Sequence, residues 1–187
     1  MLSQDVPADA LLEREPLALL LAMLLDQQIP MERAFAAPYQ LQQRLGHELD
    51  VRELAGYDPD TLAEVFATPP ALHRYPRSMA VRVQDLCRVL VERYDGDVTG
   101  LWRDVPDARE LLDRLVALPG YGKQKAQIFV ALLGKQRNVR PAGWREVAGS
   151  YGDEGVHRSV ADVTDADSLA KVREYKQQMK AAATAKK

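Results

Sequence analysis

Hydrophobic and polar residues follow one another along this chain with the period of α-helices, in segments separated by Pro, Gly and Asp. Residues 16–28 are apolar on nearly every side, which predicts a helix buried at the centre of the fold. Residues 77–94 and 107–118 instead carry one apolar stripe each, as helices covering a core do. No stretch convincingly shows the period of two expected of a strand. The pattern therefore predicts an all-α fold.

Proline, glycine and aspartate indicate where the predicted helices begin and end. Pro30 suits the first position of a helix, and Gly46 follows its last residue. Gly134 is expected to end the helix that begins at Lys123. The predicted helices cover residues 7–13, 16–28, 30–45, 59–66, 77–94, 107–118, 123–133, 144–151 and 165–183.

Length and composition place the chain among soluble globular proteins, because 47% of its 187 residues are hydrophobic and 28% are charged. This length allows one sizeable core, or two small lobes that share a core. The apolar run 16–25 is too short to span a bilayer, and no targeting segment stands out. We therefore expect a cytoplasmic protein without a membrane anchor.

The single cysteine limits the cofactors that one chain can bind. Cys87 alone cannot form an internal disulfide or an all-cysteine metal or iron–sulfur site, and it lies on the apolar side of a predicted helix. It is therefore expected to be a small buried hydrophobic residue. His47, His73 and His157 are scattered without metal-ligand spacing. The sequence predicts neither a metal nor another cofactor.

The net charge of −2 hides a strong asymmetry along the chain. Residues 1–117 contain 12 arginines, 20 Asp or Glu residues and no lysine. Residues 118–145 contain six basic residues and no acidic one, whereas residues 146–187 contain seven of each. One basic face on an otherwise acidic molecule would orient it on a polyanion. The alternative is a solvated basic turn that has no partner.

The basic region begins at Leu118-Pro119-Gly120-Tyr121-Gly122, which separates two predicted helices. Pro119 fixes φ and breaks the first helix. Gly120 and Gly122 permit positive φ and leave no side chain to hold a phosphate away. The free N–H groups and positive dipole end of the second helix then form an anion site. This pattern is typical of a helix–hairpin–helix that binds the DNA backbone.

Lys123 and Lys125 lie in the first turn of the second helix, where they oppose the helix dipole at a cost of about a few tenths of a kcal/mol each. Folding alone would favour Asp or Glu there, so an incoming phosphate explains the lysines better. The alternative is an ordinary turn in which Pro and Gly only break the chain. Contacts to the backbone carry no sequence information, so binding should be salt-sensitive and largely sequence-independent.

The residues around this hairpin, LLDRLVALPGYGKQKA from Leu111 to Ala126, resemble the helix–hairpin–helix (HhH-GPD) DNA glycosylase superfamily, the endonuclease III-like base-excision repair proteins. Upstream, LLLAMLLDQQ from Leu19 to Gln28 is similar to the buried first core helix of that family. The resemblance covers roughly residues 16–140 and is strongest at the hairpin. It implies a bilobal all-α unit over residues 1–187, with a hairpin-bearing lobe of about residues 30–134 and a second lobe of about 1–29 plus 135–187.

The resemblance also implies how DNA would be bound. A monomer would hold intact or damaged double-stranded DNA at the hairpin and flip a base into the cleft between the lobes. The glutamine matching Gln28 fills the space of the extruded base in the family, and Gln27 is similarly placed. The alternative is that Gln28 is only a polar residue at a helix end. The DNA-binding residues carried over are Gln28, Leu118, Gly120, Tyr121, Gly122, Lys123 and Lys125.

The family's catalytic lysine is missing from this chain. Bifunctional members carry it two residues after the second hairpin glycine, where this sequence has Gln124. Lys123 and Lys125 flank that position, but one helical step rotates a side chain by about 100°. Lyase activity is therefore not expected. Monofunctional members also lack the lysine, so the resemblance still allows an N-glycosylase.

The family's catalytic aspartate would fall near Pro141, and no acidic residue occurs between Leu118 and Arg145. Neither arginine nor proline can stabilise an oxocarbenium-like centre as a carboxylate does. Asp26 is the most interesting substitute, because it would lie near the cleft. Each substitute could instead be a solvated or helix-capping carboxylate. The candidate acids are Asp26, Glu146, Asp153 and Glu154.

Three functions are compatible with these observations. The first is a base-excision-repair protein resembling a DNA glycosylase, which recognises a damaged or flipped base. The second is a non-catalytic DNA-binding relative that kept the fold and lost the chemistry. The third is a protein-interaction module that uses its acidic N-terminal part. The residues support DNA binding more firmly than catalysis.

Overall fold

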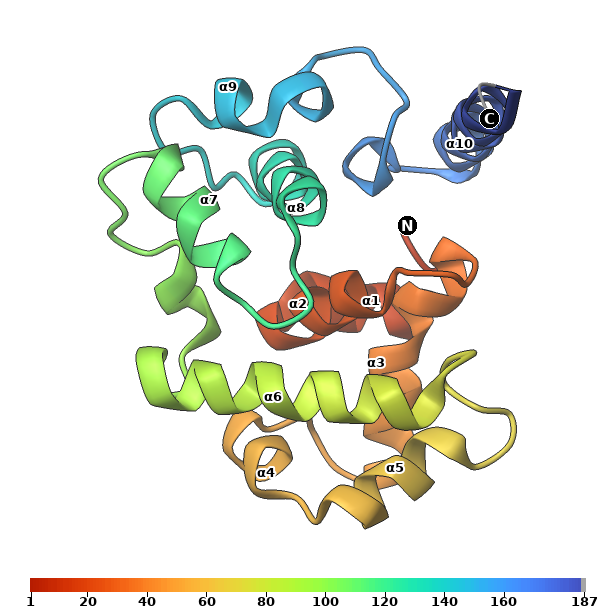
Figure 1. Cartoon of the computed structure of the whole chain (residues 1–187), viewed down its shortest axis with the longest axis vertical. Helices are drawn as coiled ribbons and strands as arrows, with labels where there is room; N and C mark the ends of the chain where they lie inside the picture. Colours follow the sequence, from red (N-terminus) through yellow and green to blue (C-terminus); the bar gives the residue numbers. More distant parts are fainter. Residues whose placement is uncertain (186–187) are drawn as a thin grey trace.

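The computed structural model describes residues 1–185, which form α-helices and short 3-10 helices and contain no strand (Figure 1). The all-α prediction is confirmed. The α-helices are α1 (Val6–Arg14), α2 (Pro16–Leu25), α3 (Met31–Leu45), α4 (Val51–Gly56), α5 (Pro59–Ala67), α6 (Pro76–Tyr94), α7 (Ala108–Val116), α8 (Lys123–Gln136), α9 (Trp144–Ala148) and α10 (Ala166–Ala185). The 3-10 helices are η1 (Val98–Leu101), η2 (Gly149–Gly152) and η3 (Val160–Asp162). None of the described helices is long and apolar enough to cross a membrane.

Helix α2 is the central element, as its apolar pattern predicts. Every residue from Leu17 to Leu25 is buried, and Figure 1 shows α2 between α6 on one side and α7 and α8 on the other. The helix ends at Leu25 instead of Gln28, because Asp26 adopts φ −72° and ψ 70° and Gln28 adopts φ 57°. The chain therefore leaves the core before the two glutamines.

The remaining helices pack in two groups around α2. Helices α4 and α5 pack against α6, whereas α7, α9, η2 and η3 pack against α8. Helices α1 and α3 pack against each other and against α2. The hairpin helices α7 and α8 thus lie with the C-terminal elements, whereas the predicted division places them with residues 30–107. One continuous hydrophobic core joins the two groups. The division of the chain into two lobes stays a prediction.

Helix α4 is absent from the predicted helices. Asp50 caps it by accepting the N–H of Glu53, and Val51 and Leu54 are its buried residues. Six residues make fewer than two turns, so a periodic pattern cannot reveal such a helix. Aspartates cap α1, α5 and α7 in the same way, which gives part of the acidic charge of residues 1–117 a structural role.

The prediction that Gly134 ends the second hairpin helix is wrong, because α8 continues to Gln136. A Cβ atom on Gly134 would lie 2.4 Å from the ring of Trp144, so the residue is glycine because the indole packs against the helix backbone. The expectation for Cys87 is confirmed. Its thiol is fully buried, and this burial raises its pKa to about 12.

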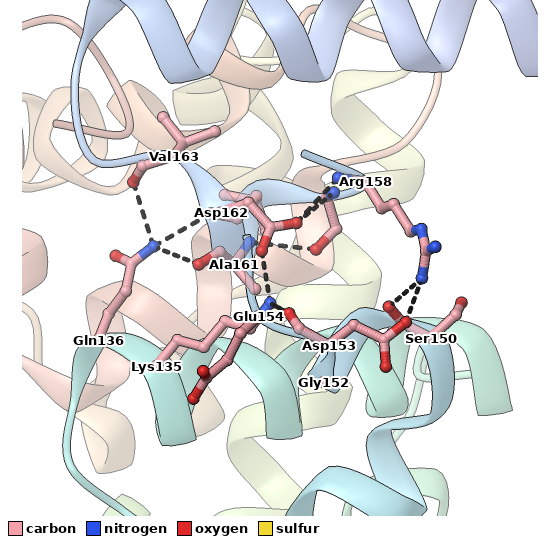
Figure 2. Close-up of polar contacts among 12 residues, drawn as sticks. Lys135, Gln136, Ser150, Gly152, Asp153, Glu154, Arg158, Ala161, Asp162 and Val163 are labelled. Carbon is pink, nitrogen blue, oxygen red and sulfur yellow. Dashed lines mark hydrogen bonds and ion pairs between the residues drawn. The ribbon is translucent and has the colours of Figure 1, made fainter. Parts of the chain in front are cut away.

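The C-terminal end of α8 holds residues 153–163 against the core (Figure 2). The Nζ atom of Lys135 lies 2.5 Å from Oδ1 of Asp162, and the two side chains are only 15% and 4% exposed. Asp162 also accepts the N–H groups of Arg158 and Ser159. Gln136 donates to the carbonyl oxygens of Val160, Ala161 and Val163. This network orients the segment that leads into α10.

Replacing Lys135 by methionine should therefore destabilise the fold. Lys135→Met leaves the Asp162 carboxylate buried without its cation, which costs about 3–5 kcal/mol of unfolding free energy. Urea denaturation measures this loss, and Lys135→Met combined with Asp162→Asn should recover part of it. Arg52→Met removes an exposed ion pair with Asp95 and should cost under about 1 kcal/mol. If Lys135→Met lowered the unfolding free energy by as little as Arg52→Met does, the stabilising role of the Lys135–Asp162 ion pair would be contradicted.

Candidate nucleic-acid interface

The hairpin between α7 and α8 is fixed to the core by two of its own side chains. Leu118 and Tyr121 are 3% and 4% exposed. The Tyr121 hydroxyl donates to the carbonyl oxygen of Leu20 in α2 at 2.7 Å, and the Tyr121 N–H donates to that of Leu118 at 3.1 Å. The two side chains thus face the core, and the DNA contact expected at Leu118 and Tyr121 stays a prediction that concerns their backbone. They attach the hairpin to the central helix because an aromatic ring with a polar tip can pack and hydrogen-bond at once.

Gly120 is required by the fold for two reasons. It adopts φ 80°, a left-handed conformation that favours glycine. A Cβ atom there would also lie 2.3 Å from Cδ1 of Leu24, so the hairpin backbone lies directly on α2. Gly120 therefore sets the distance between the hairpin and the central helix.

Gly122 is not required by the fold. It adopts φ −79° and ψ 171°, which any residue can adopt, and a Cβ atom there would have nothing within 4 Å. Of the two glycines that permit positive φ, only Gly120 adopts it. As the N-cap of α8 it also provides no side-chain cap, although Ser, Asp or Asn would be at least as good. What glycine does provide is free access to the start of α8.

The backbone at this end of α8 can bind an anion. Within residues 1–185, the N–H groups of Gly122, Lys123 and Gln124 donate no hydrogen bond to the protein. These groups carry the positive end of the helix dipole, and the neighbouring side chain of Lys123 is exposed. The start of α8 therefore combines unpaired donors, a cation and open space, which is the chemistry that a phosphate group needs.

Lys125 has a structural role that differs from its predicted contact with DNA. Its Nζ atom lies 2.6 Å and 3.0 Å from the carbonyl oxygens of Met23 and Leu24, and 3.4 Å from that of Asp26. These carbonyls end α2, so the ammonium group neutralises the negative end of that helix. Burial lowers the pKa of Lys125 to about 8, and the charge of Asp26 opposes this shift.

Residues 26–30, the wedge loop, connect α2 with α3 and present Gln28 to solvent. The preceding glutamine is fully engaged, because Gln27 donates to the carbonyl oxygen of Leu24 and accepts from Arg82 at 2.9 Å. The side chain of Gln28 is exposed, and its backbone adopts a left-handed φ of 57°. Of the two glutamines considered from the sequence, Gln28 is thus the one that can reach a ligand.

His73 holds the wedge loop from the segment between α5 and α6. Its Nε2 atom lies 2.9 Å from the carbonyl oxygen of Gln27 and 3.2 Å from that of Leu25. Its Nδ1 atom accepts the N–H of Tyr75 at 3.0 Å. This pattern needs a neutral ring protonated at Nε2. Burial lowers the pKa of His73, the nearby charges of Arg33 and Lys125 add to the shift, and the two carbonyl hydrogen bonds oppose it.

Two basic residues outside the acid-free segment also lie at the wedge loop. Arg82 of α6 contacts Gln27, and the charges of Arg82 and Lys176 both act on Lys125. Residues 1–117 are acidic on average, so the charge count along the chain does not reveal Arg82. Only the fold brings cations from α6, α8 and α10 together at the end of α2.

The two positions that carry catalytic groups in the resembling family do not come together. Gln124, in the first turn of α8, donates to the hydroxyl of Tyr151 at 2.8 Å. Pro141 lies beyond the opposite end of α8, where the Nε of Arg140 donates to the carbonyl oxygen of Gly134. The ten residues from 124 to 134 correspond to about 15 Å of helix. A group at position 141 therefore lies far from the hairpin.

Among the candidate acids, Asp26 lies at the wedge loop. It follows the last residue of α2, its side chain is 13% exposed, and its Oδ2 atom is 3.9 Å from Nζ of Lys176. Glu32, in the first turn of α3, was missed from the sequence; its side chain is 14% exposed and contacts Arg173. Glu146 is exposed on α9. Asp153 and Glu154 form ion pairs with Arg158 and Arg145.

A comparison with protein families matches this chain over residues 21–184 to the model described as HhH-GPD superfamily base excision DNA repair protein. The matched range includes the wedge loop, the hairpin and nearly all of α10. A comparison with curated proteins gave no match.

The histidine at the wedge loop predicts a pH dependence of stability. Because burial lowers the folded-state pKa of His73, the unfolded chain binds more protons between that pKa and the unfolded value of about 6.5. The contribution of His73 to the unfolding free energy is therefore fully present above this window and falls as the pH decreases through it. Urea denaturation from pH 7.5 to 5 should show a weaker pH dependence for His73→Gln than for wild type.

His157→Gln is the matched control, since it removes a histidine outside the wedge loop. Equal pH dependence in all three proteins would show that His73 is not held neutral.

Proposed function

Because the chain belongs to the HhH-GPD superfamily of base excision DNA repair proteins, we propose that it binds duplex DNA through a backbone phosphate at the start of α8. The observation that carries this proposal is Gly122, whose conformation and surroundings would accept a larger residue. A glycine that folding does not need is explained by a ligand that approaches the backbone closely.

Charge and hydrogen bonding at this position favour a phosphate over other partners. The unpaired N–H groups at the start of α8 supply donors, and Lys123 adds an exposed cation. These contacts are blind to base sequence, so affinity should depend on salt more than on sequence. The feature that favours a protein-interaction module is the acidic N-terminal segment. Several aspartates of this segment serve as helix caps, which explains part of its charge without a protein partner.

Gln28 is the residue that we propose to enter the duplex. It is exposed outside α2, and the loop that carries it is held by His73 and Arg82. A wedge needs such a fixed base, because ordering a mobile loop on binding would use up part of the binding free energy. The phosphate site is held on the same central helix through Tyr121, so both groups have a fixed relative position.

For the chemistry, we propose that the protein has no lyase activity, and that Asp26 is the carboxylate used if it hydrolyses an N-glycosidic bond. Gln124 cannot form a Schiff base, because it has no amine. The neighbouring Lys125 has its ammonium group bound to three carbonyl oxygens instead of facing a substrate. Asp26 is the carboxylate at the start of the wedge loop, with Lys125 and Lys176 close to it. The alternative function is a DNA-binding relative without catalysis, which the separation of positions 124 and 141 favours.

Substitution of Gly122 tests the phosphate site. Gly122→Asp places a carboxylate among the free N–H groups and should weaken duplex binding at least about tenfold, a change of about 1.4 kcal/mol, in fluorescence anisotropy at moderate salt. Because Asp is a good N-cap, the unfolding free energy should stay the same or rise by about a few tenths of a kcal/mol. Loss of binding would thus occur without loss of stability.

Gly122→Asn is a matched neutral control and should bind more tightly than Gly122→Asp. Gly56→Asp adds the same charge at the end of α4, where a Cβ atom also meets nothing, and should leave binding unchanged. Wild-type affinity in Gly122→Asp would refute the phosphate site.

A lesion panel separates the enzyme from the non-catalytic relative. Duplexes carrying uracil, alkylated or oxidised bases are incubated with the protein and then treated with alkali, which breaks strands at abasic sites. Strand breakage that Asp26→Asn abolishes and Glu146→Gln preserves would establish hydrolysis through Asp26. Borohydride should trap no protein–DNA adduct, since no Schiff base forms. Intact strands across the whole panel would favour the non-catalytic function.

A further inference from the structure

The C-terminal helix α10 has little apolar packing to explain its position. Only Ser168, Leu169 and Val172 are buried, all within its first two turns. From Arg173 onward its side chains are exposed, apart from the half-buried Tyr175. Figure 1 shows α10 at the edge of the molecule. Contacts other than hydrophobic burial must therefore hold the middle of this helix.

Two ion pairs join the middle of α10 to the ends of the wedge loop. Arg173 contacts Glu32 at the start of α3, and Lys176 lies 3.9 Å from Asp26 at the end of α2. Both carboxylates are largely buried, at 14% and 13% exposed. A buried carboxylate needs a cation nearby, so these pairs place a basic part of α10 beside Asp26 and Glu32, which flank Gln28 in the sequence.

Helical geometry aligns three basic residues of α10 on one side. At about 100° per residue, positions 173, 176 and 180 fall within about 60° of one another. Position 171 falls about 160° from position 173, on the opposite side. Lys171 accordingly faces the segment 155–158, with which it lines a shallow pocket. The stripe of Arg173, Lys176 and Lys180, here called the basic stripe, therefore follows the wedge-loop side of α10.

We propose that the basic stripe is a second DNA-backbone contact, in which Lys176 and Lys180 bind phosphates next to the nucleotide that Gln28 displaces. This inference rests on the proposed function. The stripe adjoins the loop that carries Gln28, because Nζ of Lys176 lies 3.9 Å from Oδ2 of Asp26 in that loop. Arg173 acts as a positioning residue, since its contact with Glu32 fixes the direction of α10.

Both lysines can reach a phosphate. The Lys176 side chain is 46% exposed, and its long separation from Asp26 leaves donors free. Lys180 is exposed one turn farther along, about 6 Å, and within residues 1–185 it has no carboxylate in ion-pair distance. A flexible cation without a protein partner gains more from a phosphate than one that already has a carboxylate.

The salt dependence of duplex binding tests the inference. Each phosphate contact contributes about 0.9 to the slope of log K against log salt concentration. Lys176→Gln combined with Lys180→Gln should therefore lower the magnitude of this slope by about 2 and weaken binding at low salt. The matched control Lys171→Gln removes a lysine from the opposite side of the same helix and should keep the wild-type slope. Circular dichroism checks that α10 remains helical in each variant.

The outcomes separate this inference from the proposed function. Wild-type protein that does not bind duplex would refute both. Binding that Gly122→Asp removes, but that keeps its wild-type slope in Lys176→Gln/Lys180→Gln, would refute the basic stripe alone. A reduced slope in the double variant and an unchanged slope in Lys171→Gln would support it.

Discussion

The ammonium group of Lys125 at the end of α2 is the contact on which the candidate interface depends. It connects the first turn of α8 to the last carbonyls of the central helix, and those carbonyls lead directly into the wedge loop. The negative end of one helix and the start of another are thus joined by a single half-buried cation. The hydroxyl of Tyr121 and the close contact of Gly120 with Leu24 fix the same two elements a few residues away.

This arrangement attaches the proposed phosphate site and Gln28 to the same central helix. Both are attached to α2, one through the hairpin and one through the backbone itself. Helix α6 contributes from the other side, since Arg82 and the segment before α6 hold the wedge loop through Gln27 and His73. Elements that are distant along the chain therefore converge on one short loop. His73, Tyr121 and Lys125 bind backbone carbonyls, whereas Arg82 contacts the side chain of Gln27.

Much of this could be predicted from the sequence, because it depends on local patterns. The buried α2, the hairpin and the role of Cys87 follow from periodicity, from Pro and Gly, and from apolar neighbours. The roles of individual residues could not be predicted, because they depend on contacts between distant segments. In the sequence, Lys125 and Tyr121 are both candidates for DNA contact. In the fold, Lys125 binds the last carbonyls of α2, and the Tyr121 hydroxyl donates to the carbonyl oxygen of Leu20. Arg82 and Glu32 gain significance only when α6 and α10 reach the wedge loop.

The burial of Cys87 has a practical consequence for experiments on this protein. The thiolate is the reactive form of cysteine, and a thiol that is fully buried with a pKa of about 12 stays protonated and inaccessible at neutral pH. Since the chain has no other cysteine, maleimide and similar reagents should leave the native protein unlabelled. A cysteine introduced at an exposed position can therefore carry a fluorophore or spin label at a single site without removing the native residue. Two such cysteines then make distances within the protein measurable while Cys87 stays in place.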